Sequence, residues 1–142
     1  ANAGTPVAAT PDGRLDREPL ADSMGAYQGR DRNGPTAMLK SVASIPHDLA
    51  PGTLVVNTRF TKDFFRTDEG RAKLKHLIRT YFDLGGMQLQ INVLDQAVLQ
   101  DAIAHPEQYE DLIVRIGGYS EYFNRLSPAL KQSVLERTEH GL

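Results

Sequence analysis

Residues 115–124 read RIGGYSEYFN, and this stretch decides how the end of the chain folds. The Gly-Gly pair 117–118 lies between an apolar run that begins at Leu112 and a segment rich in aromatic residues. Adjacent glycines in such a place commonly mark a strand that ends in a turn. A missing Cβ also permits dihedrals that other residues refuse and lets another protein approach the backbone closely. The pair is therefore either a plain turn or a glycine backbone with a chemical task.

The order of residue types in this stretch resembles the signature of the glycyl radical enzymes. That signature has an Arg, an apolar residue, a small residue, a Gly, a Tyr and, four positions after the Tyr, a Phe. The resemblance implies that Gly118 carries the radical, after an activating enzyme removes one hydrogen from its Cα. Arg115, Gly117, Tyr119 and Phe123 would then support the radical loop. We expect Tyr119 to order the loop and Phe123 to form part of apolar walls that keep out oxygen and water.

Glycine suits this task for a reason that does not depend on the family. A radical at Cα is stabilised when its orbital overlaps both the amide nitrogen and the carbonyl group, which requires a planar centre. A Cβ crowds that plane, and glycine has none.

Further segments resemble late parts of the same enzymes, in the same order, from Ala9 to His140. They are residues 9–14, 18–23 and 29–36, the run GGMQLQINV at 85–93, His105-Pro106-Glu107, and Arg137-Thr138. The Gly-Gly form of the loop and the ending ERTEH look closer to the dehydratase and lyase branch than to pyruvate formate-lyase proper. By resemblance to the diol dehydratases, Arg137 is a candidate residue of the substrate cavity.

The chain alternates predicted helices and strands, which indicates an α/β fold. Residues 1–35 are irregular and rich in Gly and Pro, and by the resemblance this segment packs across the face of a barrel. We then expect a helix over 36–44 capped by Thr36, a strand over 52–60, a helix from Asp68 capped by Asp68 or Thr67 and ended by Gly85-Gly86, and a strand over 87–93. After these we expect a helix capped by Asp95, a strand over 112–116, and a last helix from Ser127-Pro128 to about His140.

These few strands do not close a sheet. The resemblance therefore implies the C-terminal part of a ten-stranded α/β barrel of glycyl radical enzyme type, with the glycyl radical loop and the final helix. We divide the chain into a C-terminal barrel segment, residues 1–84, and a glycine radical domain, residues 85–142.

Composition excludes several classes of function. The 142 residues are 40% hydrophobic and 24% charged, with a net charge of −2, which argues against nucleic acid or an acidic membrane surface as partner. No apolar run is long enough to span a membrane. The start of the chain shows no signal peptide, so we expect a cytoplasmic protein. The four His residues have no metal-ligand spacing, and we expect neither a metal nor a bound cofactor in this chain.

The chain contains no Cys. Disulfides, Cys-ligated zinc, an iron–sulfur cluster and a Cys nucleophile are therefore excluded within it. In the family that it resembles, the radical passes from Gly to a Cys on a separate loop, and the Cys thiyl radical attacks the substrate. We therefore expect the chain to be incompetent alone, and the thiyl Cys to lie on the rest of the barrel or on a separate chain.

The resemblance implies anaerobic, oxygen-sensitive chemistry that breaks a C–O, C–N or C–C bond in a small substrate. The implied partners are an activating enzyme that uses S-adenosylmethionine and an iron–sulfur cluster, the remainder of the barrel, the small-molecule substrate, and a second copy of the full enzyme in a dimer.

Two other interpretations stay open. The chain could be a freestanding spare part that restores an oxygen-damaged enzyme of the pyruvate formate-lyase type, although residues 11–35 and 52–60 exceed what such a part requires. It could also be a non-catalytic α/β binding module whose Gly-Gly turn contacts a ligand, although it has neither a G-x-G-x-x-G nor a P-loop motif.

Overall fold

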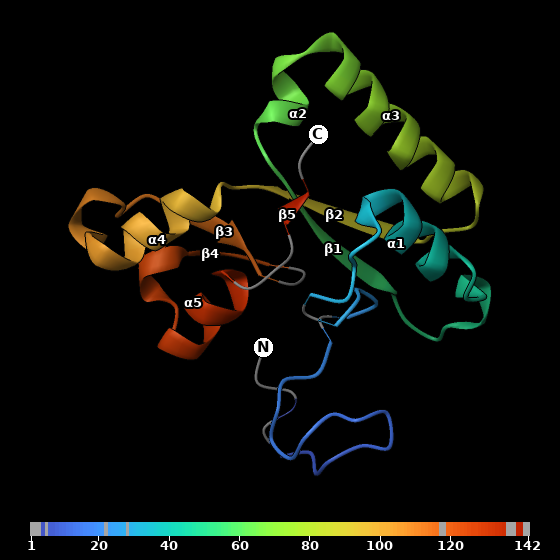
Figure 1. The fold of residues 1–142 in the computed structure, drawn as a ribbon, viewed down its shortest axis with the longest axis horizontal. Coiled ribbons are helices and arrows are strands. Elements are labelled where there is room, and N and C mark those ends of the chain that lie inside the picture. Colours follow the sequence, from blue (N-terminus) through green and yellow to red (C-terminus); the bar gives the residue numbers. More distant parts are fainter. Residues whose placement is uncertain are drawn as a thin grey trace.

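The computed structural model describes residues 4, 6–21, 23–27, 29–116, 119–135 and 139–140. In chain order the elements are α1 (Gly34–Ala43), η1 (His47–Leu49), β1 (Val55–Phe60), α2 (Asp63–Arg66), α3 (Asp68–Asp83), β2 (Gln88–Val93), α4 (Gln96–Ala104), η2 (Pro106–Gln108), β3 (Ile113–Arg115), β4 (Ser120–Tyr122), η3 (Phe123–Arg125), α5 (Pro128–Leu135) and β5 (Glu139–His140). Figure 1 shows these elements as a mixed α/β arrangement, so the predicted fold class is confirmed.

The larger sheet is parallel, with strand order β2-β1-β5. β1 and β2 are joined through α2 and α3 and pair over their whole length, from Val55 beside Gln88 to Phe60 beside Val93. The side chains of Val56 and Phe60 point to the face that the helices cover. Two apolar clusters fill that interface: Met38, Leu39, Val42, Val56 and Tyr81, and next to them Phe60, Phe64 and Leu74. One face of this sheet is therefore apolar, and its other face is polar.

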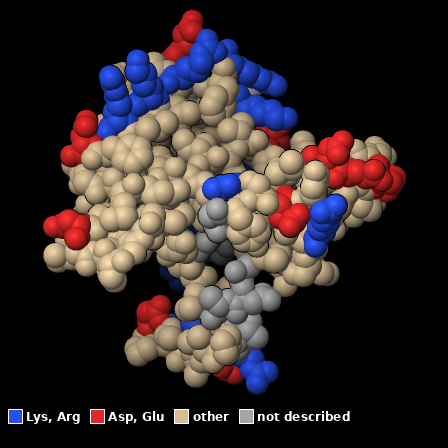
Figure 2. All heavy atoms as spheres, turned by 180° about the vertical axis from the view of Figure 1, so that it is seen from behind, with Lys and Arg blue, Asp and Glu red and all other residues tan. Residues whose placement is uncertain are grey.

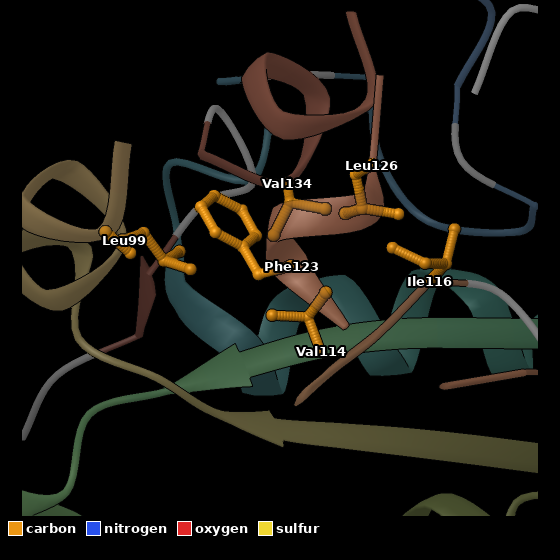
Figure 3. Packing of buried hydrophobic residues seen from close by; sticks show 7 residues of the cluster. Leu99, Val114, Ile116, Phe123, Leu126 and Val134 are labelled. Atoms are coloured by element: carbon orange, nitrogen blue, oxygen red, sulfur yellow. The ribbon is translucent and has the colours of Figure 1, made fainter. Parts of the chain in front are cut away.

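The smaller sheet is an antiparallel hairpin of β3 and β4, with Ile113 opposite Tyr122 and Arg115 opposite Ser120. It packs with α4, η3 and α5 at the other end of the molecule from α3 (Figure 1). A separate apolar cluster forms here from seven buried residues, Leu99, Ala102, Val114, Ile116, Phe123, Leu126 and Val134 (Figure 3). The hairpin is thus held by a core of its own.

Several local predictions are confirmed. The Thr67 hydroxyl accepts a hydrogen bond from the Gly70 N–H at 3.0 Å and caps α3, with Glu69 in the first turn. Gly85 follows the end of α3 with a positive φ of 96°, which glycine adopts at little cost. Pro128 starts α5, and the Ser127 hydroxyl accepts from the Leu130 N–H at 3.4 Å.

Three boundaries were predicted wrongly. Thr36 lies inside α1, because Pro35 occupies the first turn and Asn33 precedes the helix. The first strand begins at Val55 rather than at Gly52. The final helix does not run to His140, since Glu139 and His140 form β5 beside Arg59 and Phe60.

Arg59 of β1 contacts the described part of α5. This side chain is only 3% exposed, and one guanidinium nitrogen donates to the Val134 carbonyl at 3.0 Å. Both terminal nitrogens lie 3.4 Å from the Leu135 carbonyl. A buried guanidinium requires hydrogen-bond partners, and these bonds attach α5 to β1.

The irregular segment before α1 is organised around Arg14. Its guanidinium is buried and donates to the carbonyls of Val7, Ala8, Leu15 and Glu18. The Met24 N–H donates to the Val55 carbonyl at 3.0 Å, which attaches the segment to β1. The rest of the barrel, across which we expect the segment to run, lies outside this chain.

Gly70→Ala is expected to lower the free energy of unfolding by about 1–3 kcal/mol. A Cβ at Gly70 would lie 2.6 Å from the Phe64 carbonyl oxygen, which is backbone and cannot rotate away. Gly52→Ala is the control, because nothing lies within 4 Å of its added Cβ. Chemical denaturation followed by circular dichroism measures both variants, and equal midpoints would contradict the packing at the α2–α3 corner.

Candidate functional site

The β3–β4 hairpin closes directly around the Gly-Gly pair. The Ile116 N–H donates to the Tyr119 carbonyl at 2.9 Å. This bond joins the residues on either side of the pair, and tight hairpin connections favour glycine. Gly117 and Gly118 themselves lie outside the described residues, so their predicted roles stay predictions. The flanking bond nevertheless fixes where the chain enters and leaves the pair.

The described contacts of Arg115 include hydrogen bonds to three neighbours. Its Nε donates to Gln90 Oε1 at 3.0 Å, its Nη1 donates to Ser120 Oγ at 3.2 Å, and its backbone N–H donates to Asn92 Oδ1 at 3.2 Å. It is thus more than a surface charge, because its contacts join the hairpin to β2. Its predicted part in supporting a radical loop is compatible with this position and stays a prediction.

Phe123 lies directly after β4 and is fully buried. Figure 3 shows its ring between Leu99 and Val134, with Val114 of the other hairpin strand nearby. The wall next to the hairpin is therefore buried and largely apolar. Tyr119 differs, because it is 50% exposed and its backbone carbonyl accepts the hydrogen bond from the Ile116 N–H.

The base of the hairpin is anchored by polar contacts. The Asn124 amide donates to the Pro106 carbonyl at 2.6 Å and to the Tyr109 carbonyl at 3.1 Å. The Tyr109 hydroxyl donates to Asp101 Oδ2 at 2.5 Å, and His105 Nδ1 lies 2.9 Å from Asp101 Oδ1. The bond from Tyr109, and after it the one from His105, lowers the pKa of Asp101, while the same carboxylate raises the pKa of Tyr109. The match at His105-Pro106-Glu107 thus falls on a structural turn under the hairpin.

Arg137, the candidate residue for the substrate cavity, lies outside the described residues, and its role stays a prediction. Sequence reasoning missed Arg59 and the pairing of Gln90 and Asn92 with Arg115. The only sequence signal for that pairing is the i, i+2 spacing of the two amides, which places them on one face of β2.

Charge is segregated over the surface, which the net charge of −2 conceals. Figure 2 shows Lys and Arg gathered over α2 and α3, and Asp and Glu gathered at the opposite end near η2. Some of these cations are paired, as Lys73 is with Glu69 at 2.9 Å. The expectation that nucleic acid is not a partner stays a prediction.

Among the described residues no group of three or more His, Asp or Glu side chains is placed to hold a metal ion. A separate search of the same part of the chain finds no helix with the length and apolar character that crossing a membrane requires.

Comparison with known proteins defines the class. The family model described as Glycine radical matches residues 20–124, and the chain belongs to this family.

Its relatives are glycyl radical dehydratases and lyases. The chain is 40% identical over 136 residues to trans-4-hydroxy-L-proline dehydratase of Clostridioides difficile, covering 96% of this chain and 17% of that enzyme. It is 45% identical over 141 residues to isethionate sulfite-lyase of Oleidesulfovibrio alaskensis, again covering 96% of this chain and 17% of that protein. The predicted branch of the family is thereby confirmed.

Among solved structures, the glycerol-bound form of the B12-independent glycerol dehydratase of Clostridium butyricum superimposes with a TM-score of 0.93. The two are 40% identical, and the match covers 98% of this chain and 18% of that one. The fold is therefore the C-terminal part of a glycyl radical enzyme barrel, as predicted. The division at residue 84 stays a prediction.

Proposed function

We propose that this chain is the radical-storing portion of a glycyl radical lyase or dehydratase and that Gly118 holds the radical. The supporting observation is the Ile116–Tyr119 hydrogen bond, which brackets Gly117-Gly118 at the tip of a hairpin, in a chain of the Glycine radical family. The chain spans less than a fifth of the relatives that it matches. Substrate, partners and the activity of the whole enzyme therefore belong to this proposal.

The chain's task is to store, shield and place the radical. An activating enzyme that uses S-adenosylmethionine removes one hydrogen from the Gly118 Cα. The apolar cluster around Phe123 and Ile116 keeps water from the base of the hairpin, since such clusters are closely packed. The radical then passes to a Cys outside this chain, which has no Cys of its own, and that thiyl radical abstracts hydrogen from the small substrate. The enzyme is cytoplasmic and works without oxygen.

Oxygen cleavage tests the position of the radical. A Cα radical adds O₂ to form a peroxyl radical, and the backbone then breaks at that residue. After anaerobic activation of the complete protein and exposure to air, mass spectrometry is expected to find a cut at Gly118. Gly52→Ala is expected to be cut like the parent and Gly118→Ala to stay intact. A cut elsewhere, or none in an activated parent, would refute the assignment.

Adding the chain to an enzyme that air has already cut distinguishes the spare-part alternative from the proposed function. If the chain is a spare part, adding it to an enzyme already cut at its own radical glycine restores turnover. If the chain is instead part of its own barrel, adding it does not restore the turnover of the cut enzyme. The segment before α1 and the strand β1, both matched in the relatives, favour the barrel portion.

A further inference from the structure

We propose that Gln90 and Asn92 are positioning residues, which set the place of the radical hairpin by holding Arg115 from two sides. This inference rests on the proposed function and deepens it. The described contacts of both amides with the hairpin run to Arg115.

The burial of Gln90 is the first observation. Gln90 is 7% exposed, and no other residue of β2 is as deeply buried. A buried amide is costly unless it is hydrogen-bonded, so a strand favours an apolar residue here unless the amide has a task. Its Oε1 accepts the Arg115 Nε–H at 3.0 Å. The polar side chain thus faces the hairpin rather than solvent.

The contact of Asn92 is the second observation. Within the described ranges β3 pairs with β4 alone, so the other edge of β3 presents backbone groups with no strand beside it there. Asn92 Oδ1 accepts the Arg115 backbone N–H at 3.2 Å. The side chain therefore stands where a neighbouring strand would otherwise supply a carbonyl. β2 therefore binds Arg115 of the hairpin through both the side chain and the backbone of that residue.

Through Arg115, these contacts with β2 hold both strands of the hairpin. Arg115 lies opposite Ser120 in the ladder and donates to the Ser120 hydroxyl at 3.2 Å. The next residue, Ile116, closes the connection through its bond to Tyr119. A two-stranded hairpin is marginal on its own, so its tip is only as well placed as its lateral contacts. Hydrogen transfer requires close approach, and a misplacement of about 1 Å costs roughly 100-fold in rate.

Variants of the complete enzyme test whether Gln90 and Asn92 position the hairpin. Gln90→Met and Asn92→Leu keep approximate size and remove the acceptor, whereas Gln90→Glu and Asn92→Asp keep an acceptor oxygen. Gln88→Met is the matched control, because Gln88 lies on the same strand and face and accepts from the Val56 N–H at 3.3 Å rather than from the hairpin. Turnover is divided by the number of unpaired spins, so that misfolded or unactivated enzyme does not count.

Gln90→Met and Asn92→Leu are expected to lose about 10- to 100-fold of turnover per spin with KM unchanged. The acceptor-keeping variants are expected to recover most of it, and Gln88→Met to match the parent. Parental turnover per spin in both acceptor-free variants would overturn the proposal.

A second measurement does not depend on the radical. Hydrogen exchange in the unactivated enzyme is expected to be about five- to tenfold faster for residues 113–122 in Gln90→Met and Asn92→Leu than in Gln88→Met. Unchanged exchange would overturn the positioning role of the two amides even if the parent forms a radical. Faster exchange in these two variants, in an enzyme whose parent never forms a radical, would instead refute the proposed function and leave the positioning role of the two amides standing.

Discussion

Gly118→Ala is expected to reduce anaerobic turnover of the complete enzyme to background. The added Cβ crowds the planar centre that a Cα radical requires, so the activated state is neither formed nor stored. Product formation after activation, measured by chromatography, is the readout.

Gly52→Ala is the matched control for this loss. It also replaces a glycine by alanine, but its Cβ meets no atom within 4 Å, and turnover is expected to stay at the parental level. Turnover of Gly118→Ala at the level of Gly52→Ala would mean that another residue carries the radical.

Phe123→Ala is expected to destabilise the hairpin unit by about 3–5 kcal/mol. Phe123 is fully buried, and its ring contacts both α4 and α5 through Leu99 and Val134 (Figure 3). Its removal leaves a cavity that the surrounding helices only partly fill. Hydrogen exchange of residues 96–135 measures the local loss, and chemical denaturation measures the total.

The control for Phe123 is Phe82→Ala. Phe82 is 45% exposed on α3, so its truncation is expected to cost much less, within about 0.5–1 kcal/mol. Equal effects of the two substitutions would contradict the apolar wall beside the hairpin. An accompanying loss of radical lifetime in Phe123→Ala alone would link that wall to storage.

The parts of the fold that were predictable have local causes. Thr67 caps α3, Gly85 ends it and Pro128 begins α5, and each acts within a few residues of its own position. The β1–α3–β2 unit follows from the change between helical and strand periodicity.

The parts that were missed depend on distant contacts. β5 has two residues, Glu139 and His140, and exists through its pairing with β1, so no periodicity could reveal it. The attachment of α5 to β1 depends in the same way on Arg59, more than seventy positions earlier. The short helix α2 and the strand β4 are too brief to carry a pattern.

The residues of the candidate site show the same difference between what a sequence pattern predicts and what depends on distant contacts. The resemblance to the family pointed to Arg115 and Phe123 as supports of the radical loop. The amides that hold Arg115 became visible only when β2 and β3 were seen side by side, because Gln90 and Asn92 are more than twenty positions away in sequence. Gly118 and Arg137 rest on the family pattern.

Electron paramagnetic resonance of the activated complete enzyme, produced with α-deuterated glycine, tests the central claim most directly. The account predicts a doublet in ordinary enzyme, from the single remaining α-hydrogen of Gly118, which collapses toward one line after deuteration and is missing in Gly118→Ala. Ring-deuterated tyrosine is expected to leave the doublet unchanged. A signal that responds to tyrosine rather than glycine, or one that persists in Gly118→Ala, would contradict the account.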